Sequence, residues 1–324
     1  MPHVHVLMPG QFETPADMAG SNLASVRMRV VPAALALQAR GTQVTWGEQV
    51  QGTPDRVLVA KIGGHDIAAR QAQWLQQIAQ ARRCGASIWV DYTDHHLGYA
   101  SVMSGFYASV LELADAFTVP SACMQRLLSG QWQGPVQVVP DAIEVDCVVP
   151  KNAHGEPVTA LWFGHASNVA YLRTFLEEGL VADQPLRLIV LSNQAGLDIL
   201  TARPIEARVP LDILVAEWSI DTMREAAQQS DVCLIPSDTQ DPKKMAVSAN
   251  RLITALALGL PTAADWLESY AEFGAYFTDI RSGELAALLQ QPTRHADRVA
   301  EAQRSVVPRF AQAAVSAAWA RVLG

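Results

Sequence analysis

Short apolar runs and helix-like segments alternate along almost the whole chain of 324 residues, and the series starts afresh near its middle. The apolar runs have the length and composition of buried strands, and the segments between them have helical periodicity. This alternation predicts an α/β fold with parallel sheets and right-handed crossovers. The expected strands are Val4–Met8, Gln43–Trp46, Arg56–Ala60, Ser87–Asp91, Ala116–Val119 and Val136–Val139, then Thr159–Phe163, Arg187–Leu191, Leu211–Ala216, Val232–Ile235 and Thr262–Ala264.

A stretch rich in Pro, Gly and acidic residues, Pro140 to Pro157, separates the two series. It predicts two Rossmann-like domains of ordinary size, residues 1–145 and 155–295. Residues 296–324 form a third segment, expected to be helical with an interruption near Pro308.

The segment from Asp231 to Ala264 indicates a phosphate-binding site. A polar loop, Ser237 to Lys244, leaves a buried strand and leads into a helix that ends at Gly259 and Pro261. Open α/β sheets bind ligands where a loop leaves the carboxyl end of a parallel strand. The helix N-terminus favours an anion there, and lysine and arginine side chains in this segment add positive charge.

The end of this segment, Ala257-Leu258-Gly259-Leu260-Pro261, resembles the donor-binding segment of the two-Rossmann (GT-B type) glycosyltransferases, and the family 4-like members most of all. The resemblance extends over most of the chain. It implies two parallel-sheet domains that face each other across a cleft, with the acceptor on the first domain, the nucleotide-sugar donor on the second, and the 296–324 tail packed back on the first. The usual glutamates of the retaining branch are missing, because Thr254 stands at one position and the loop offers only Asp238 and Asp241 for the other.

Within this resemblance, the first turn of the second half and the basic loop form the donor side. Gly164 permits close approach of the backbone, and Ser167 or Asn168 can cap the following helix. Capping alone also explains those two residues. The residues expected to bind the donor are Gly164, His165, Asn168, Lys243, Lys244, Ser248, Asn250, Arg251 and Thr254. Arg251 is also expected to stabilise the departing phosphate.

The first half supplies the expected acceptor side. Asp94 and His95 follow an apolar strand, and one of them is expected to act as the general base; a polar loop that merely caps the next helix is an equally good interpretation. Arg27 and Arg29 are expected to contact the acceptor, although two surface arginines would give the same pattern. His65, in a Gly-Gly turn, is the weakest candidate.

The composition of the chain limits the classes of partner that it is expected to bind. The net charge of −8 disfavours a nucleic-acid binder and permits at most peripheral membrane contact. The sequence shows neither a signal peptide nor a membrane-spanning run, and its four cysteines include no C-x-x-C pair, so a cytoplasmic protein without zinc is expected. No G-x-G-x-x-G follows the first strand, which disfavours an NAD-dependent dehydrogenase.

The sequence therefore predicts a metal-independent glycosyltransferase without a cofactor. Its donor is expected to be a nucleotide sugar, and its acceptor a glycan, a lipid-linked glycan or a protein. Two alternatives stay open: a nucleotide-sugar 2-epimerase, and a non-catalytic GT-B protein that only binds a glycan or a nucleotide.

Overall fold

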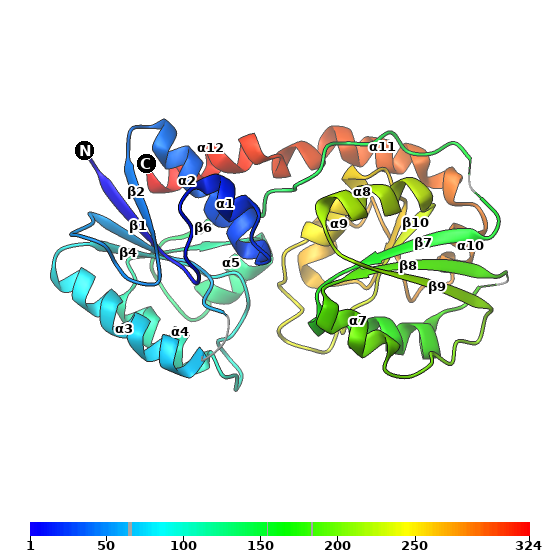
Figure 1. Cartoon of the computed structure of the whole chain (residues 1–324), viewed down its shortest axis with the longest axis horizontal. Coiled ribbons are helices and arrows are strands. Elements are labelled where there is room, and N and C mark those ends of the chain that lie inside the picture. The colour runs from blue at the N-terminus through cyan, green and yellow to red at the C-terminus, as the bar shows by residue number, and fades with distance from the viewer. Residues whose placement is uncertain (64–66, 154, 183) are drawn as a thin grey trace. The chain divides into compact units, whose positions relative to one another are not determined.

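The computed structural model describes residues 1–63, 67–153, 155–182 and 184–324, which form two compact units (Figure 1). The first unit consists of Met1–Ala142, Met245–Ser248 and Arg309–Gly324, and the second of Ile143–Lys244 and Ala249–Pro308. Every strand expected from the sequence is present with ends within one residue of the prediction. One short strand, β12, was not predicted.

The first unit is built on a six-stranded sheet of order β2-β1-β3-β4-β5-β6, in which all neighbouring strands are parallel. Its strands are β1 (His3–Leu7), β2 (Gln43–Gly47), β3 (Arg56–Val59), β4 (Ser87–Asp91), β5 (Ala116–Val119) and β6 (Val136–Val138). Its helices are α1 (Pro15–Ala19), α2 (Val31–Ala39, after a π-helical turn at Val26–Val30), α3 (Ile67–Arg83), α4 (Ser104–Leu113), α5 (Ala122–Ser129) and α12 (Gln312–Leu323).

Alternating side chains of this sheet enter two separate cores. Val57 and Val59 pack with apolar residues of α3, α4 and α5, whereas Leu58 packs with residues of α1, α2 and α12. Trp319 of α12 is fully buried in the second of these cores. The C-terminal helix is thus an integral layer of the first unit, while residues 296–308 of the expected tail belong to the second unit.

The second unit contains a six-stranded parallel sheet of order β12-β11-β10-β7-β8-β9. Its strands are β7 (Val158–Phe163), β8 (Leu186–Ser192), β9 (Leu211–Glu217), β10 (Val232–Ile235), β11 (Thr262–Ala264) and β12 (Thr278–Asp279). Its helices are α6 (Val169–Thr174, continued by a π-helical turn at Phe175–Gly179), α7 (Gln194–Thr201), α8 (Ile220–Gln229), α9 (Asn250–Ala257), α10 (Glu284–Gln290) and α11 (Ala296–Ser305).

The strand order gives each sheet a switch point. In the second sheet the chain runs outward from β7 to β9, returns to β10 beside β7, and then runs outward to β12. In doubly wound sheets ligands bind outside the carboxyl ends of the strands at such a point, here between β7 and β10. Two parallel, doubly wound sheets confirm the predicted fold class of two Rossmann-like domains. None of the helices in the described ranges has the length and apolar character needed to cross a bilayer.

A buried histidine in β1 predicts a specific dependence of stability on pH. His5 has no exposed surface, and its Nδ1 atom lies 2.8 Å from Thr45 Oγ1, a hydroxyl that also lies 2.9 Å from His3 Nε2. Burial, opposed by a hydrogen bond with the Gly47 backbone and reinforced by His3, lowers the pKa of His5 from 6.5 to about 4. Below pH 6.5 the unfolded chain therefore binds a proton that the folded chain rejects, so this residue reduces stability as the pH falls toward 4.

We expect the His5→Val variant to lack this contribution, which amounts to at most about 3 kcal/mol at 1.36 kcal/mol per pKa unit. Urea unfolding of both proteins between pH 7.5 and 4 measures it. The wild type should lose more free energy of unfolding than the variant over this range. Parallel curves for the two proteins would contradict the prediction.

Candidate functional site

The carboxyl edge of the second sheet gathers polar side chains around its switch point. Gly164 follows β7, Ser237 follows β10 and Asp265 follows β11, and these three strands are neighbours in the sheet. Because neighbouring strands lie about 4.8 Å apart, the three turns occupy one short stretch of the edge.

Arg251 lies against the turn after β7. A Cβ atom added to Gly164 would stand 3.5 Å from Arg251 Nη1, which is ordinary contact, and 3.0 Å from the ring of Trp162, which is too close, so the turn passes directly beside the guanidinium and the indole ring. Arg251 Nη1 is buried and has no hydrogen-bond partner within the described ranges. A buried donor is normally paired, because an unsatisfied one costs about 1–3 kcal/mol. Gly164 and Arg251, two residues expected at the donor site, therefore lie next to each other, and their role in donor binding stays a prediction.

Three backbone amides of this turn already have acceptors within the unit. Gly164 N–H donates to Leu191 O (3.0 Å), Ala166 N–H to Asn193 Oδ1 (3.0 Å), and Ser167 N–H to His165 Nδ1 (3.3 Å). His165 thus caps the turn, a role that the sequence had suggested for Ser167 or Asn168. These three amides are therefore not available to an anion.

The basic loop is tied to the first turn of α6 by three side-chain contacts. Lys244 Nζ donates to Asn168 Oδ1 (2.8 Å) and lies 5.0 Å from the centre of the Tyr171 ring. Tyr171 Oη donates to Asp241 Oδ2 (3.3 Å), so the loop is held to α6 at Asp241 as well as at Lys244. Burial, and then the Asp241 carboxylate, raises the pKa of Tyr171 and keeps its hydroxyl protonated. The structure therefore brings together Lys244 and Asn168, two residues expected in the donor site.

The remaining donor-side residues have different surroundings. Lys243 is exposed and Asn250 is half-buried at the start of α9. Thr254 is only 4% exposed, which leaves little of its side chain for a ribose. Ser248 belongs to Met245–Ser248, which is part of the first unit, where Ala246 is buried in the core beside α3 to α5.

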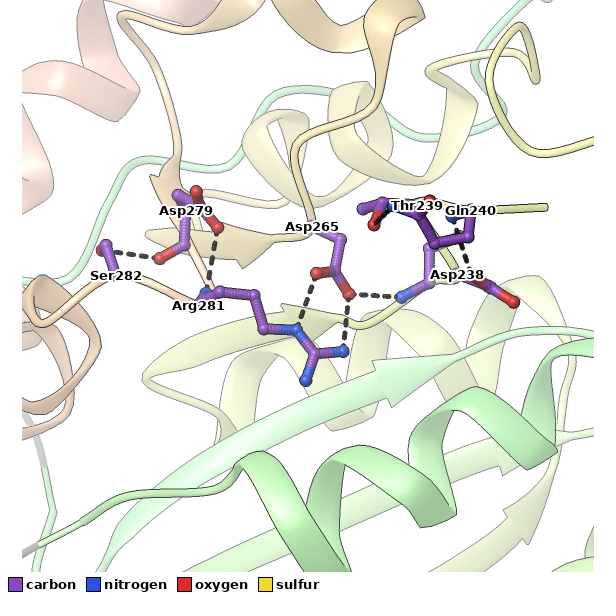
Figure 2. Close-up of polar contacts among 8 residues, drawn as sticks. Asp238, Thr239, Gln240, Asp265, Asp279, Arg281 and Ser282 are labelled. Carbon is purple, nitrogen blue, oxygen red and sulfur yellow. Dashed lines mark hydrogen bonds and ion pairs between the residues drawn. The ribbon is translucent and has the colours of Figure 1, made fainter. Parts of the chain in front are cut away.

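A second polar cluster at the same edge was not anticipated (Figure 2). Asp265 is 1% exposed and accepts hydrogen bonds from Arg281 Nε (2.8 Å), Arg281 Nη2 (3.2 Å) and Ser237 N–H (2.7 Å). Hydrogen bonding to Asp265 raises the pKa of the Arg281 guanidinium, despite the opposing effect of burial. Asp265 and Arg281 each stand just beyond a strand, but strand-end position is only a weak sequence signal.

In the first unit, the loop after β4 carries the expected base. Tyr92 Oη accepts N–H groups of His96 (2.6 Å) and Leu97 (3.0 Å), which fixes the loop, and lies 3.3 Å from His95 Nδ1. Burial lowers the pKa of His95 below its ordinary value, so the imidazole is neutral at pH 7 and able to accept a proton.

Asp94 is paired with Lys61, which follows β3 and was not singled out from the sequence. Burial by itself would lower the pKa of Lys61, but the carboxylates of Asp94, Asp141 and Asp91 outweigh it and raise that pKa. The lysine is therefore charged and holds the Asp94 carboxylate in place. Thr93 in the same loop has a buried hydroxyl without a partner among the residues that the structure describes.

Arg29 has a structural role in place of the expected acceptor contact. Its side chain is 1% exposed and forms two hydrogen bonds with Asp91 (2.6 and 2.7 Å), one with Asp141 (2.8 Å) and one with the Val139 carbonyl (2.7 Å). An arginine so enclosed has no surface left for a substrate. Arg27 is 8% exposed and donates to Ser21 O (2.5 Å), and its role at the acceptor stays a prediction.

Two further expectations concern His65 and metal ions. His65 lies outside the described residues. Over residues 1–63, 67–153, 155–182 and 184–324, no three His, Cys, Asp or Glu side chains are grouped as they would be around a metal ion.

Comparison with known proteins gives a clear result for the fold. No family model matches the chain, and no curated protein matches its sequence. Among solved structures, similarity extends over nearly the whole length to Anabaena HepE in complex with UDP (12% identity, TM-score 0.59, 100% of this chain and 99% of that one). It extends likewise to a DNA-modifying β-glucosyltransferase studied with and without uridine diphosphoglucose (11%, 0.58, 99% and 98%). Acinetobacter baumannii MurG is a third match (14%, 0.51, 100% and 99%).

The chain therefore has the GT-B fold, as its sequence predicts. Identities of this size establish the fold alone, so the reaction has to be argued from the residues of this chain.

Proposed function

We propose that the protein transfers a sugar from a nucleotide-sugar donor to a hydroxyl acceptor, and that the second unit binds the donor. The observation that carries this proposal is the buried Arg251 Nη1 beside Gly164 at the switch point of the sheet, which has no hydrogen-bond partner among the residues that the structure describes. An anionic ligand with several oxygen atoms would satisfy that donor, and a diphosphate has this chemistry. UDP in HepE and uridine diphosphoglucose with the β-glucosyltransferase favour a uridine diphosphate sugar as the donor.

In the proposed reaction the acceptor oxygen forms a bond to the anomeric carbon, and the bond from that carbon to the phosphate oxygen breaks. Arg251 stabilises the negative charge that develops on the departing phosphate, with Lys243 and Lys244 as further sources of positive charge. The acceptor hydroxyl loses its proton to a base in the first unit. Neutral His95 is better suited to this task than Asp94, because the ion pair with Lys61 stabilises the Asp94 carboxylate.

We also propose that the reaction needs no metal ion and no cofactor, because side-chain charge is available where the phosphate leaves. The acceptor class follows from the family resemblance and is a glycan, a lipid-linked glycan or a protein.

The proposal is tested by thermal unfolding with UDP, GDP, CDP, CMP and dTDP, followed by an assay of sugar transfer or donor hydrolysis in excess EDTA. A ligand at 100 times its dissociation constant stabilises the folded state by about 2.7 kcal/mol, so one nucleotide should raise the melting temperature clearly. We expect UDP to raise the melting temperature, and we expect turnover of the corresponding UDP-sugar to persist in EDTA. Nucleotide binding without turnover would indicate a non-catalytic protein. Formation of an epimer would indicate a 2-epimerase. Failure to bind any of these nucleotides would refute the donor site.

A further inference from the structure

Ser237 has a buried hydroxyl that the fold itself does not use. The residue is 5% exposed, and its Oγ atom has no hydrogen-bond partner within the described part of the chain. Hydroxyl groups in protein interiors are almost always paired, since burial without a partner is unfavourable. The unpaired hydroxyl thus destabilises the unliganded protein. Its presence is therefore explained best by a hydrogen-bond partner outside the fold.

The backbone at Ser237 is held firmly in place. Its N–H donates to Asp265 Oδ2 (2.7 Å), and Arg281 grips both oxygens of the same carboxylate. Arg281 is itself fixed, because its backbone N–H donates to Asp279 Oδ1 (2.9 Å). The backbone carbonyl of Asp279 also accepts a hydrogen bond from Ser282 Oγ (2.7 Å). Figure 2 shows this chain of contacts from the end of β12 to the loop after β10.

Ser237 also lies where the chain leaves β10, beside the turn after β7 that Arg251 contacts. In the register of β10 and β7, Cys233 faces Leu161, so the chain beyond Ile235 emerges level with the chain beyond Phe163. The two turns are then about one strand spacing apart. Two buried donors without a partner in the described parts of the chain, Ser237 Oγ and Arg251 Nη1, therefore flank the switch point of this sheet.

We propose that Ser237 Oγ donates a hydrogen bond to the diphosphate of the bound nucleotide, and that Asp265 and Arg281 are positioning residues that hold Ser237 for this contact. The inference rests on the proposed donor site and adds three residues to it. Arg281 neutralises Asp265, so the carboxylate can fix the Ser237 backbone without presenting a net negative charge to the phosphates.

The test compares Ser237→Ala with the wild type by calorimetric titration of UDP and of uridine, or of the corresponding pair if the nucleotide screen identifies another base. Loss of a hydrogen bond to a charged group should weaken UDP binding roughly tenfold and leave uridine binding unchanged. The melting temperature of the unliganded variant should be equal to or above that of the wild type, because the unsatisfied hydroxyl is gone. A hydroxyl with a merely structural role would shift that temperature the other way.

Ser230→Ala is the matched control. Ser230 is buried at the amino end of β10, away from the proposed site, and its Oγ donates to Ala226 O (2.8 Å). This variant should melt at a lower temperature and bind UDP like the wild type.

The positioning role is tested by combining changes. Arg281→Ala should weaken UDP binding severalfold in the wild type and less in Ser237→Ala, where only the uncompensated charge of Asp265 still acts, and Arg281→Lys should restore part of the loss. Unchanged UDP affinity in Ser237→Ala, equal weakening for uridine, or additive effects of the two changes would overturn the inference. Failure of the wild type to bind any nucleoside diphosphate would instead refute the proposed function.

Discussion

The Arg251→Ala variant is expected to lose both donor affinity and turnover, with a rate at least about 100-fold below that of the wild type. In the wild type, Arg251 Nη1 is buried beside Gly164 with no partner in the described ranges, so the proposed diphosphate is the group that completes the hydrogen bonding of this arginine. Arg251→Lys should stay impaired, because an ammonium group cannot grip two oxygens as the guanidinium fork does. UDP titration and steady-state kinetics measure the two effects separately.

Arg304→Ala is a suitable control for this experiment. Arg304 belongs to the same unit, but it lies on α11 with a side chain that is 68% exposed and paired with Glu301. It should bind UDP and turn over its sugar like the wild type. A folded Arg251→Ala protein with wild-type affinity and rate would show that the phosphates bind elsewhere.

Loss of the buried arginine in the first unit should have the largest effect on stability. Arg29→Met removes the guanidinium that is paired with both Asp91 and Asp141, and removing one partner from a buried ion pair costs about 3–5 kcal/mol. Arg29→Lys should cost less, since it keeps the charge and loses only the forked contact with Asp91. The free energy of unfolding in urea measures both effects.

The exposed pair between Arg82 and Asp115 provides the comparison. Both side chains are 41% exposed at a separation of 2.8 Å, so Arg82→Met should cost less than about 1 kcal/mol. A similarly small cost for Arg29→Met would mean that the buried network is not required for the stability of the first unit.

The turn after β7 and the loop between β10 and α9 could be located from the sequence because their signals are local, and their role in donor binding stays a prediction. Gly164 directly follows β7, and the Lys-bearing loop leads from β10 into α9, the helix that carries Arg251. The parallel topology then brings those strand ends to one edge of the sheet. The acceptor side was less predictable, because the spacing of Arg27 and Arg29 does not show which side of the helix is buried. Only the folded unit encloses Arg29 between Asp91 and Asp141.

By itself, the sequence determined the two series of strands and their parallel arrangement, because apolar runs, glycines and prolines act over a few residues. The GT-B fold was implied by the resemblance of the segment ending at Pro261 to that superfamily. The tertiary structure decided which polar groups meet. Lys61 reaches Asp94 from the neighbouring strand, Arg281 reaches Asp265 across the ends of β11 and β12, and Ser237 is left with a buried hydroxyl. These pairings depend on strand order and on burial, and both arise only when distant segments pack into one sheet.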